Sequence, residues 1–171
     1  MSVRTSGSFL SGSGWHLQTI YFLGERAWQG RKAFAFSDGV GTTYFDARRR
    51  TLGRVKADVL VESFAPYFVL AEWPLVIGKQ WPNRYRHHDY VSGRRFDDVQ
   101  YDGKVEAHED VKTPAGTFKA FRIHLGGISS NTILWYSGDL GIFIKTRNER
   151  FSNHYLGSGV REAELAIYAE R

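Results

Sequence analysis

Apolar side chains occur at every second position along most of this chain of 171 residues. Phe121, Ile123 and Leu125, for example, alternate with Arg122 and His124, so an extended backbone there has one apolar face and one polar face. Short clusters of Gly, Pro, Asp and Asn interrupt this alternation about every ten residues. The pattern predicts a β meander of about ten short strands with little helix.

The segments predicted to be extended are residues 15–23, 27–36, 40–46, 55–61, 67–70, 84–91, 99–112, 118–125, 131–136, 141–147, 150–156 and 160–169. Turns are predicted at residues 24–26, 37–39, 112–117 and 137–141, with a charged connection at residues 92–98. Residues 73–82 contain two Trp-Pro pairs and are predicted to form a loop that Trp73 and Trp81 anchor to the core. The last segment has the Ala and Glu content of a helix, but its period-two pattern favours a strand.

The expected fold class is all-β, with a single antiparallel meander that forms a half-open barrel or a strongly curved sheet. A flat open sheet of this size would expose one face and two edges, and curling removes much of that exposure. A closed barrel and a two-sheet sandwich are the alternatives. Residues 1–13 are rich in Ser and Gly and are expected to be a flexible lead-in. Residues 14–171 are expected to form one β domain.

Composition removes several classes of chemistry. The chain has no cysteine, which excludes disulfides, thiolate nucleophiles and cysteine-ligated zinc. Aromatic residues make up 15% of the chain, a share that suits pleated surfaces. No run of about 18 apolar residues is present, so no transmembrane segment is expected. The formal net charge of +5 is spread along the chain, which favours solubility over a dedicated polyanion site, and nucleic acid is disfavoured as a partner.

Three motifs occur in the second half of the chain. They are PLVIGKQW at residues 74–81, VKTPAGTFKA at residues 111–120 and WYSGDLG at residues 135–141. In this order they resemble the PL-x-x-G-x-x-W, V-x-x-PAGTF-x-A and WYSPxLG motifs of a group of uncharacterised bacterial proteins. The resemblance covers residues 70–148, and Gly138 stands where that group generally has proline.

The resemblance implies a fold and a location rather than an activity. Members of the group are usually exported, and their fold is similar to the curved antiparallel half-barrel of the periplasmic lipoprotein carriers. A periplasmic or secreted protein is therefore expected, with the cytoplasm as the alternative. The motif residues themselves are predicted to be structural, because they form two turns and the aromatic side chains that hold them.

A ligand-binding surface is the leading functional expectation. Arg122 and His124, with Trp135 and Tyr136 on the next strand, are predicted to line the concave face of the sheet. A basic and aromatic surface suits an amphiphile with an anionic head group and an acyl tail. The alternative is that these side chains face solvent on the convex side. The full set of predicted ligand-binding residues is Trp81, Tyr85, Arg122, His124, Trp135 and Tyr136.

Catalysis is the second possibility and polyanion binding the third. A hydrolase would use His87, Asp89 or the neighbouring Asp97 and Asp98, but the chain contains neither H-E-x-x-H nor G-x-S-x-G. The glycine-rich residues 126–131 are read as a strand connection rather than an anion cradle. A polyanion binder would use the arginines Arg48, Arg49, Arg50, Arg94 and Arg95. The sequence favours a non-enzymatic exported β module with a lipid-like small molecule or a protein as partner, and with no catalytic residue, cofactor or metal.

Overall fold

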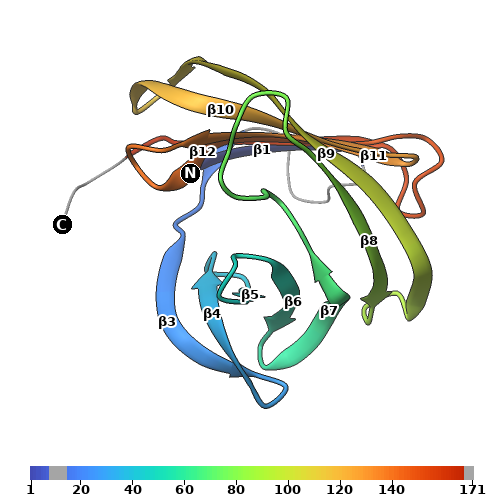
Figure 1. Cartoon of the computed structure of the whole chain (residues 1–171). Helices are drawn as coiled ribbons and strands as arrows, with labels where there is room; N and C mark the ends of the chain where they lie inside the picture. Colours follow the sequence, from blue (N-terminus) through green and yellow to red (C-terminus); the bar gives the residue numbers. More distant parts are fainter. Residues whose placement is uncertain (8–14, 168–171) are drawn as a thin grey trace. The chain divides into compact units, whose positions relative to one another are not determined.

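The computed structural model describes residues 1–7 and 15–167, and within these residues it contains strands but no helix. The strands are β1 (Ser2–Gly7), β2 (Trp15–Leu17), β3 (Tyr21–Trp28), β4 (Arg31–Ser37), β5 (Thr42–Phe45), β6 (Thr51–Lys56), β7 (Val59–Phe68), β8 (Gln80–Asp89), β9 (Arg94–Thr113), β10 (Gly116–Gly127), β11 (Ser130–Ser137), β12 (Ile142–Arg150) and β13 (Gly159–Glu164). Each strand from β3 to β13 pairs with its neighbour in the chain, and β1 joins β13 to β2. The prediction of an all-β antiparallel meander is confirmed, and the sheet is not closed, because β2 and β3 are its end strands (Figure 1).

The chain divides into two compact units. Unit 1 comprises Met1–Gln18, Trp73–Trp81 and Asp102–Arg171, and unit 2 comprises Thr19–Glu72 and Pro82–Tyr101. Strands β8 and β9 contribute residues to both units. The expected lead-in includes β1, which pairs with β13, whereas residues 8–13 lie outside the described residues. The expectation of one domain over residues 14–171 stays a prediction.

Unit 1 is an antiparallel sheet with buried side chains on both faces. Ile123 and Leu125 on β10 are fully buried, and Leu134 on β11 lies opposite Ile123. This is the face that the alternation along residues 118–125 assigns to the core. On β12, Ile144 is also fully buried, and it belongs to a hydrophobic cluster with Val111, Ala120 and Leu165. Period-two patterning therefore predicts the buried face at Ile123 and Leu125, but the cluster of Ile144 packs against Trp135 on the other face, which the sequence did not assign to the core.

The tryptophans of the Trp-Pro segment anchor it as the sequence predicts, but residues 80–82 belong to strand β8 and not to a loop. Trp73 contacts the ring of Tyr136 at a centroid distance of 4.6 Å, and the amide of Gly78 donates a 2.8 Å hydrogen bond to the carbonyl of Val105. Trp81 is the second residue of β8 and is 6% exposed. Its indole lies against the backbone of Gly103, where no side chain could fit. Both tryptophans thus hold the segment to the core of unit 1.

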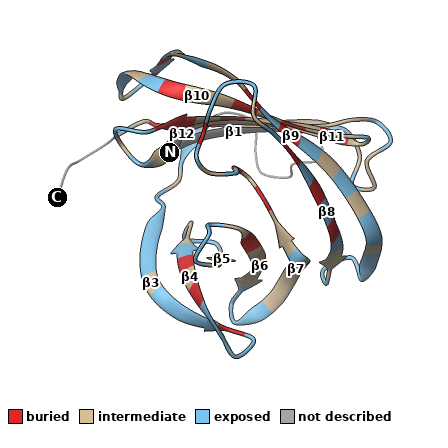
Figure 2. Cartoon of the chain, viewed as in Figure 1, coloured by how far each residue is buried: buried red, intermediate tan, exposed pale blue. Residues whose placement is uncertain are grey.

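Unit 2 contains β3 to β7 with the adjoining parts of β8 and β9. Its strands β3 to β7 are successive neighbours in a strongly curved sheet (Figure 1). One face of β3 and β4 is closely packed. Ala33 and Ala35 are fully buried, and Trp28 is 8% exposed and lies over Gly53. Figure 2 shows the contrast between the buried positions on β4 and β6 and the largely exposed strand β3.

One predicted turn and one predicted strand are wrong. Residues 24–26 do not turn, because β3 continues through them and Gly24, at φ 79°, instead forms a bulge opposite β4. The turn lies at Gln29 and Gly30, where both residues have positive φ. Residues 55–61 are not one strand, since Ala57 and Asp58 adopt positive φ and form the hairpin between β6 and β7. Neither turn has the Asn-Gly, Asp-Gly or Gly-Gly pair by which a two-residue hairpin turn is usually recognised.

Other boundaries also change. Residues 92–98 are not merely a connection, because β9 begins at Arg94 and extends for 20 residues. Residues 141–147 and 150–156 are not two strands, because a single strand, β12, ends at Arg150 and a loop follows. The ambiguous last segment forms β13, as its alternation predicts, while residues 168–169 of that segment lie outside the described residues. The part of the chain that the structure describes contains no helix suited to crossing a membrane.

Candidate functional site

Aromatic side chains in unit 2 gather on one face of the sheet, and the strand register shows which face it is. Phe36 on β4 lies opposite Thr43, which lies opposite Arg54, which lies opposite Glu62. Directly opposed residues of antiparallel strands project to the same side, as do residues two apart on one strand. The face that carries Phe36 is therefore the face that carries Glu62 and, two residues further along β7, Phe64.

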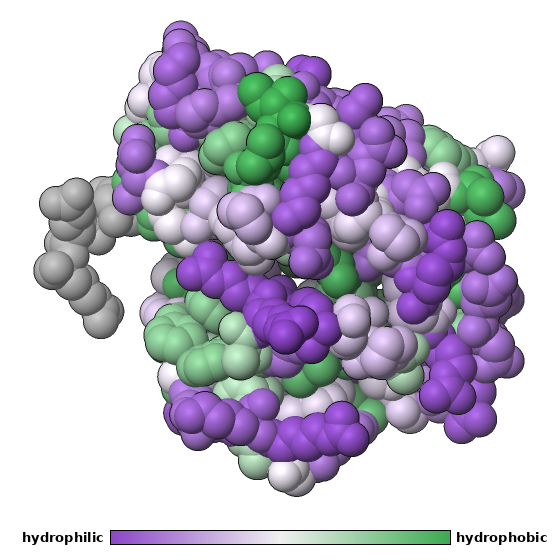
Figure 3. All heavy atoms as spheres, viewed as in Figure 1, coloured by the Kyte–Doolittle hydropathy of each residue, from purple (hydrophilic) through white to green (hydrophobic). Residues whose placement is uncertain are grey.

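The first group on this face is the phenylalanine cluster, defined as Phe22, Phe34, Phe36 and Phe45. Phe36 lies 4.9 Å from Phe22 and 5.6 Å from Phe45, measured between ring centroids, and Phe22 lies 6.4 Å from Phe34. Phe22 is 61% exposed and Phe36 is 37% exposed. Hydrophobic side chains gather over β3 and β4 in Figure 3. These rings contact one another but remain accessible to solvent.

The second group is the aromatic ladder, defined as Phe64, Phe68, Tyr85, His87, Phe96 and Tyr101. Phe64 contacts Phe68, Tyr85 and His87 at centroid distances of 5.8, 5.6 and 5.0 Å. Phe68 and Tyr85 both contact Tyr101. All the rings of the ladder are half-buried except Tyr85, which is 8% exposed. The ladder is a connected aromatic surface that is incompletely covered.

Tyr85 is the most deeply buried ring of the ladder. Burial raises the pKa of the Tyr85 hydroxyl well above its ordinary value, and the neighbouring Tyr101 and Glu62 raise this pKa further because they disfavour a second negative charge. Tyr85 is therefore a neutral hydroxyl at every physiological pH. It can donate or accept a hydrogen bond but cannot act as a phenolate nucleophile.

His87 is held between two rings of the ladder. Its imidazole stacks on Phe64 with an interplanar angle of 12° and on Phe96 with an angle of 14°. The Nε2 atom is buried and has no hydrogen-bond partner, and it lies 3.6 Å from the Glu62 carboxylate. A buried polar atom without a partner is uncommon in native structures and needs a reason.

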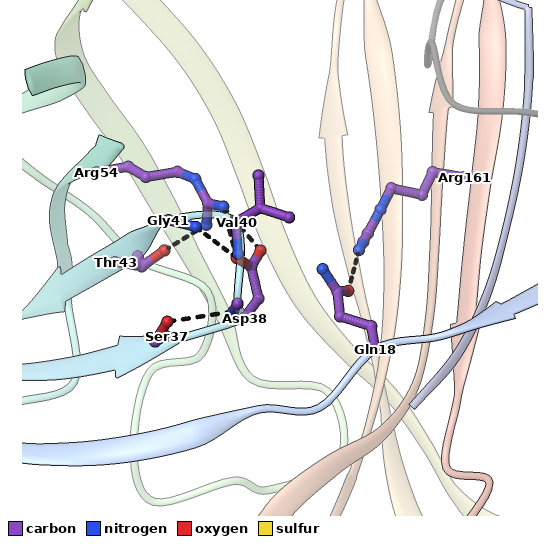
Figure 4. Close-up of polar contacts among 9 residues, drawn as sticks. Gln18, Ser37, Asp38, Val40, Gly41, Thr43, Arg54 and Arg161 are labelled. Carbon is purple, nitrogen blue, oxygen red and sulfur yellow. Dashed lines mark hydrogen bonds and ion pairs between the residues drawn. The ribbon is translucent and has the colours of Figure 1, made fainter. Parts of the chain in front are cut away.

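A polar network surrounds Asp38 in the turn between β4 and β5 (Figure 4). The Asp38 carboxylate accepts hydrogen bonds from both the Val40 and Gly41 amides, and Arg54 donates to its two oxygens over 2.9 and 2.8 Å. Arg54 also donates to the Thr43 hydroxyl. Partial burial alone would raise the pKa of Asp38, but the Gly41 amide, the Arg54 guanidinium and the Val40 amide together lower it.

The Asp38 network predicts a pH-dependent contribution to stability. Because the pKa of Asp38 is lower in the folded chain than its ordinary value of 3.8, its stabilisation is present above pH 3.8 and is lost as pH falls through the folded-state pKa. Asp38→Asn is expected to lower the free energy of unfolding by about 2 kcal/mol at pH 7. Urea denaturation of wild type and variant should show this difference shrinking between pH 5 and pH 2.

Asp110→Asn is the matched control for Asp38→Asn. Asp110 pairs with Lys119, and both side chains are more than half exposed, so this pair contributes little. A difference between wild type and Asp38→Asn that is equally small, or that stays constant down to pH 2, would contradict the stabilising role of the Asp38 network.

In unit 1, three of the predicted ligand-binding residues share one face. Arg122 lies opposite Trp135, and His124 is two residues from Arg122 on β10. Arg122 donates a 3.1 Å hydrogen bond to Glu106 and contacts Glu109 at 3.5 Å, while the Trp135 indole N–H donates to Glu109 over 2.9 Å. The positive charge that the sequence assigned to an anionic ligand head group is thus balanced by two carboxylates.

The other predicted ligand-binding residues lie elsewhere. Tyr136 lies opposite Phe121 on the other face of unit 1 from Arg122, and it is 7% exposed against Trp73 and Phe143. Trp81 is buried in unit 1 over Gly103. Tyr85 belongs to the aromatic ladder of unit 2. A single site formed by all six residues stays a prediction.

The residues of the hydrolase alternative have structural contacts. His87 and Asp89 share a face, as their spacing predicts, but the Asp89 carboxylate accepts hydrogen bonds from the Val91 and Ser92 amides of the β8–β9 turn. The His88 ring contacts Tyr90. Asp97 and Asp98 are exposed, and Asp98 accepts a hydrogen bond from Gln100. Within the described ranges, no group of three or more His, Cys, Asp or Glu side chains could hold a metal ion.

The arginines of the polyanion alternative do not form one uniform positive patch. Arg50 pairs with Asp46 at 2.6 Å, and its guanidinium lies 3.6 Å from the centroid of the Tyr67 ring. Arg48 and Arg49 are exposed in the loop between β5 and β6, and Arg94 and Arg95 are exposed on β9. Arg48–Arg50 and Arg94–Arg95 form two separate runs in the sequence, and Arg50 in the first run is neutralised by Asp46.

Sequence reasoning missed most of the aromatic ladder. Of its six residues, it singled out Tyr85 as a ligand-binding residue and His87 as a catalytic candidate, but not Phe64, Phe68, Phe96 or Tyr101. The available signal was the i, i+2 spacing of Tyr85 and His87, which places both side chains on one face of a strand. The pairing of Phe64 with His87 depends on the register between β7 and β8, which the sequence does not specify.

Comparison with known proteins gives little on which a function can be based. No family model matches the chain, and no curated protein matches it. Among solved structures, the chain aligns with the hypothetical lipoprotein YmcC from Escherichia coli (K12). The sequence identity is 9% and the TM-score 0.47, and the alignment covers 94% of this chain and 82% of that chain.

Proposed function

We propose that this protein is a non-enzymatic, exported β module that binds a hydrophobic or amphiphilic small molecule on the aromatic face of unit 2. One observation carries the proposal: the phenylalanine cluster and the aromatic ladder share one face of the sheet and remain incompletely covered. Export is part of the proposal because of the resemblance of the three motifs in the second half of the chain.

The energetics support an apolar ligand on this face. Each square ångström of apolar surface removed from water contributes about 25 cal/mol, so covering about 200 Å² of ring surface contributes about 5 kcal/mol before the cost of association. Groups of exposed apolar side chains on soluble proteins mark binding sites more often than single exposed apolar residues do. Phe22, at 61% exposure, and Phe36, at 37%, are rings that such a ligand would cover.

The electrostatics favour this face over the face of Arg122 in unit 1. An anionic head group at Arg122 would compete with Glu106 and Glu109, which already accept its hydrogen bonds. Displacing those carboxylates would leave two like charges beside the new anion, which is unfavourable. The aromatic face of unit 2 requires no such displacement.

Binding of N-phenyl-1-naphthylamine, a neutral fluorophore that brightens in apolar surroundings, tests the proposal. The wild-type protein is expected to bind it with a micromolar dissociation constant. Phe64→Ala removes the ring that contacts three others in the ladder and is expected to weaken binding about tenfold, which corresponds to about 1.4 kcal/mol. Fluorescence titration below the thermal midpoint of both proteins measures the change.

Phe151→Ala is the matched control for Phe64→Ala. Phe151 is a half-buried ring in unit 1, and the hydrogen bond from its backbone amide to Ser129 does not depend on the side chain. This variant should bind the fluorophore within about twofold of wild type, a difference of less than about 0.5 kcal/mol. Absence of binding to the wild-type protein, or equal losses in both variants, would reject the aromatic face of unit 2 as the ligand site.

A further inference from the structure

The carboxylate of Glu62 brings negative rather than positive charge to the face of the aromatic ladder. Glu62 is on the same face as Phe64, and its side chain is 36% exposed. Tyr85 contacts Phe64 and Tyr101, which adds two hydroxyl oxygens to the same group of rings. The faces of the rings also present negative electrostatic potential. A carboxylate, phenol oxygens and ring faces together form an electron-rich surface.

No permanent cation among the described residues forms an ion pair with Glu62. Arg54 lies opposite it in the register, but the Arg54 guanidinium is directed to Asp38 and Thr43. Among the described residues, the one ion-pair partner of Glu62 is His87, at 3.6 Å, and that pair carries opposite charges only when the imidazole is protonated. The Nε2 atom of His87 has no hydrogen-bond partner, so the imidazole does not satisfy the carboxylate by hydrogen bonding.

From this arrangement we infer that Glu62 and the aromatic ladder bind the organic cation of an amphiphile, an alkylammonium head group. The inference rests on the proposed function and names the class of head group that the aromatic face selects. Alkylammonium ions are attracted to ring faces within about 6 Å of the centroid and to carboxylates, and their weak hydration makes them easy to bury. A metal ion is a poorer fit, because rings are not its ligands and the described residues offer no cluster of ligating groups.

The long-range field of the protein opposes this preference, which makes the test strict. With a formal net charge of +5, the chain attracts anions at a distance. A preference for cations therefore has to arise from local contacts. It should also persist in 0.15 M salt, where the long-range attraction is screened beyond about 8 Å.

The experiment compares three probes with the same ten-carbon tail, decyltrimethylammonium, decyl maltoside and decyl sulfate, each below its micelle-forming concentration. Isothermal titration calorimetry on the full chain is expected to show decyltrimethylammonium binding at least tenfold more tightly than the other two. Glu62→Gln is expected to remove that tenfold preference while leaving the affinity for decyl maltoside within twofold. Glu25→Gln makes the same change of charge on β3, where the carboxylate pairs with Lys32, and should keep the preference.

The outcomes separate the two proposals. If none of the three probes binds, the proposed function itself fails. If all three bind with equal affinity, or decyl sulfate binds best, the aromatic face is a hydrophobic site without cation selectivity and the inference about Glu62 is overturned. The comparison of probes on the wild-type protein decides this even if Glu62→Gln does not fold.

Discussion

Replacing Gly103 with alanine is expected to lower the thermal midpoint by about 6–12 °C, which corresponds to about 3 kcal/mol in a chain of this length. A Cβ atom on Gly103 would lie 2.5 Å from both Cζ2 and Nε1 of Trp81. Trp81 is 6% exposed, so its indole cannot turn out of the way without leaving the core. Either the tryptophan or the backbone of β9 must therefore shift, and thermal denaturation followed by circular dichroism measures the cost.

The control for Gly103→Ala is Gly138→Ala. Gly138 has nothing within 4 Å of the position where a Cβ atom would be, and its φ is not positive. The same substitution there should leave the midpoint within about 2 °C of wild type. The double variant Gly103→Ala/Trp81→Leu should lose less stability than the sum of the losses in the two single variants. The shorter leucine side chain no longer overlaps the new Cβ atom at position 103. Additive losses would show that the contact between Trp81 and Gly103 is not the cause.

Much of the fold of unit 1 could be predicted from the sequence because local rules and the final structure agree there. The alternation of Phe121, Ile123 and Leu125 gives both the strand and the buried face, and Ile123 and Leu125 are fully buried. The Pro114 and Gly116 turn lies where the sequence places it, with β9 ending at Thr113 and β10 beginning at Gly116. In these segments the backbone preference of each residue matches its burial.

The predictions failed in two ways: a residue typical of turns lies within a strand, and a hairpin forms where the sequence predicted a strand. Gly24 suggested a turn, but its positive φ is used in a bulge that lets β3 continue. Ala57 and Asp58 gave no turn signal, yet both adopt positive φ in the hairpin from β6 to β7. The register between β6 and β7 places the hairpin at these two residues, and single-residue preferences do not report that register.

The candidate site could be predicted only in part, for a similar reason. The two-residue periodicity of a strand puts Tyr85 and His87 on the same face. The contact of His87 with Phe64, however, requires the register between β7 and β8. The same periodicity correctly places Arg122 and His124 on one face, but it cannot show that Glu106 and Glu109 contact Arg122. Charge balance across strands therefore decides the electrostatic character of each face, and the sequence alone does not give it.

The second large effect is expected at Asn83 in β8. Asn83→Asp should lower the free energy of unfolding by about 3 kcal/mol at pH 7. Asn83 is 2% exposed, and its amide pairs with the backbone of Val69, just beyond the end of β7. The Val69 amide donates to Oδ1 over 2.7 Å, and Nδ2 donates to the Val69 carbonyl over 3.0 Å. An aspartate keeps the acceptor but places a buried carboxylate oxygen against that carbonyl.

The pH dependence of Asn83→Asp distinguishes this cause from a general loss of packing. Burial and the facing carbonyl would raise the pKa of the introduced carboxyl, so the neutral form, which can donate to Val69, becomes populated as pH falls. The difference in the free energy of unfolding between wild type and Asn83→Asp should therefore become smaller from pH 7 to pH 4, as urea denaturation measures it. Asn153→Asp, at an exposed asparagine whose Nδ2 donates to the Ile128 carbonyl over 2.9 Å, should cost less than about 1 kcal/mol. A deficit at Asn83 that is independent of pH would mean that the amide serves only to fill space, and that the chain after β7 is held by other contacts.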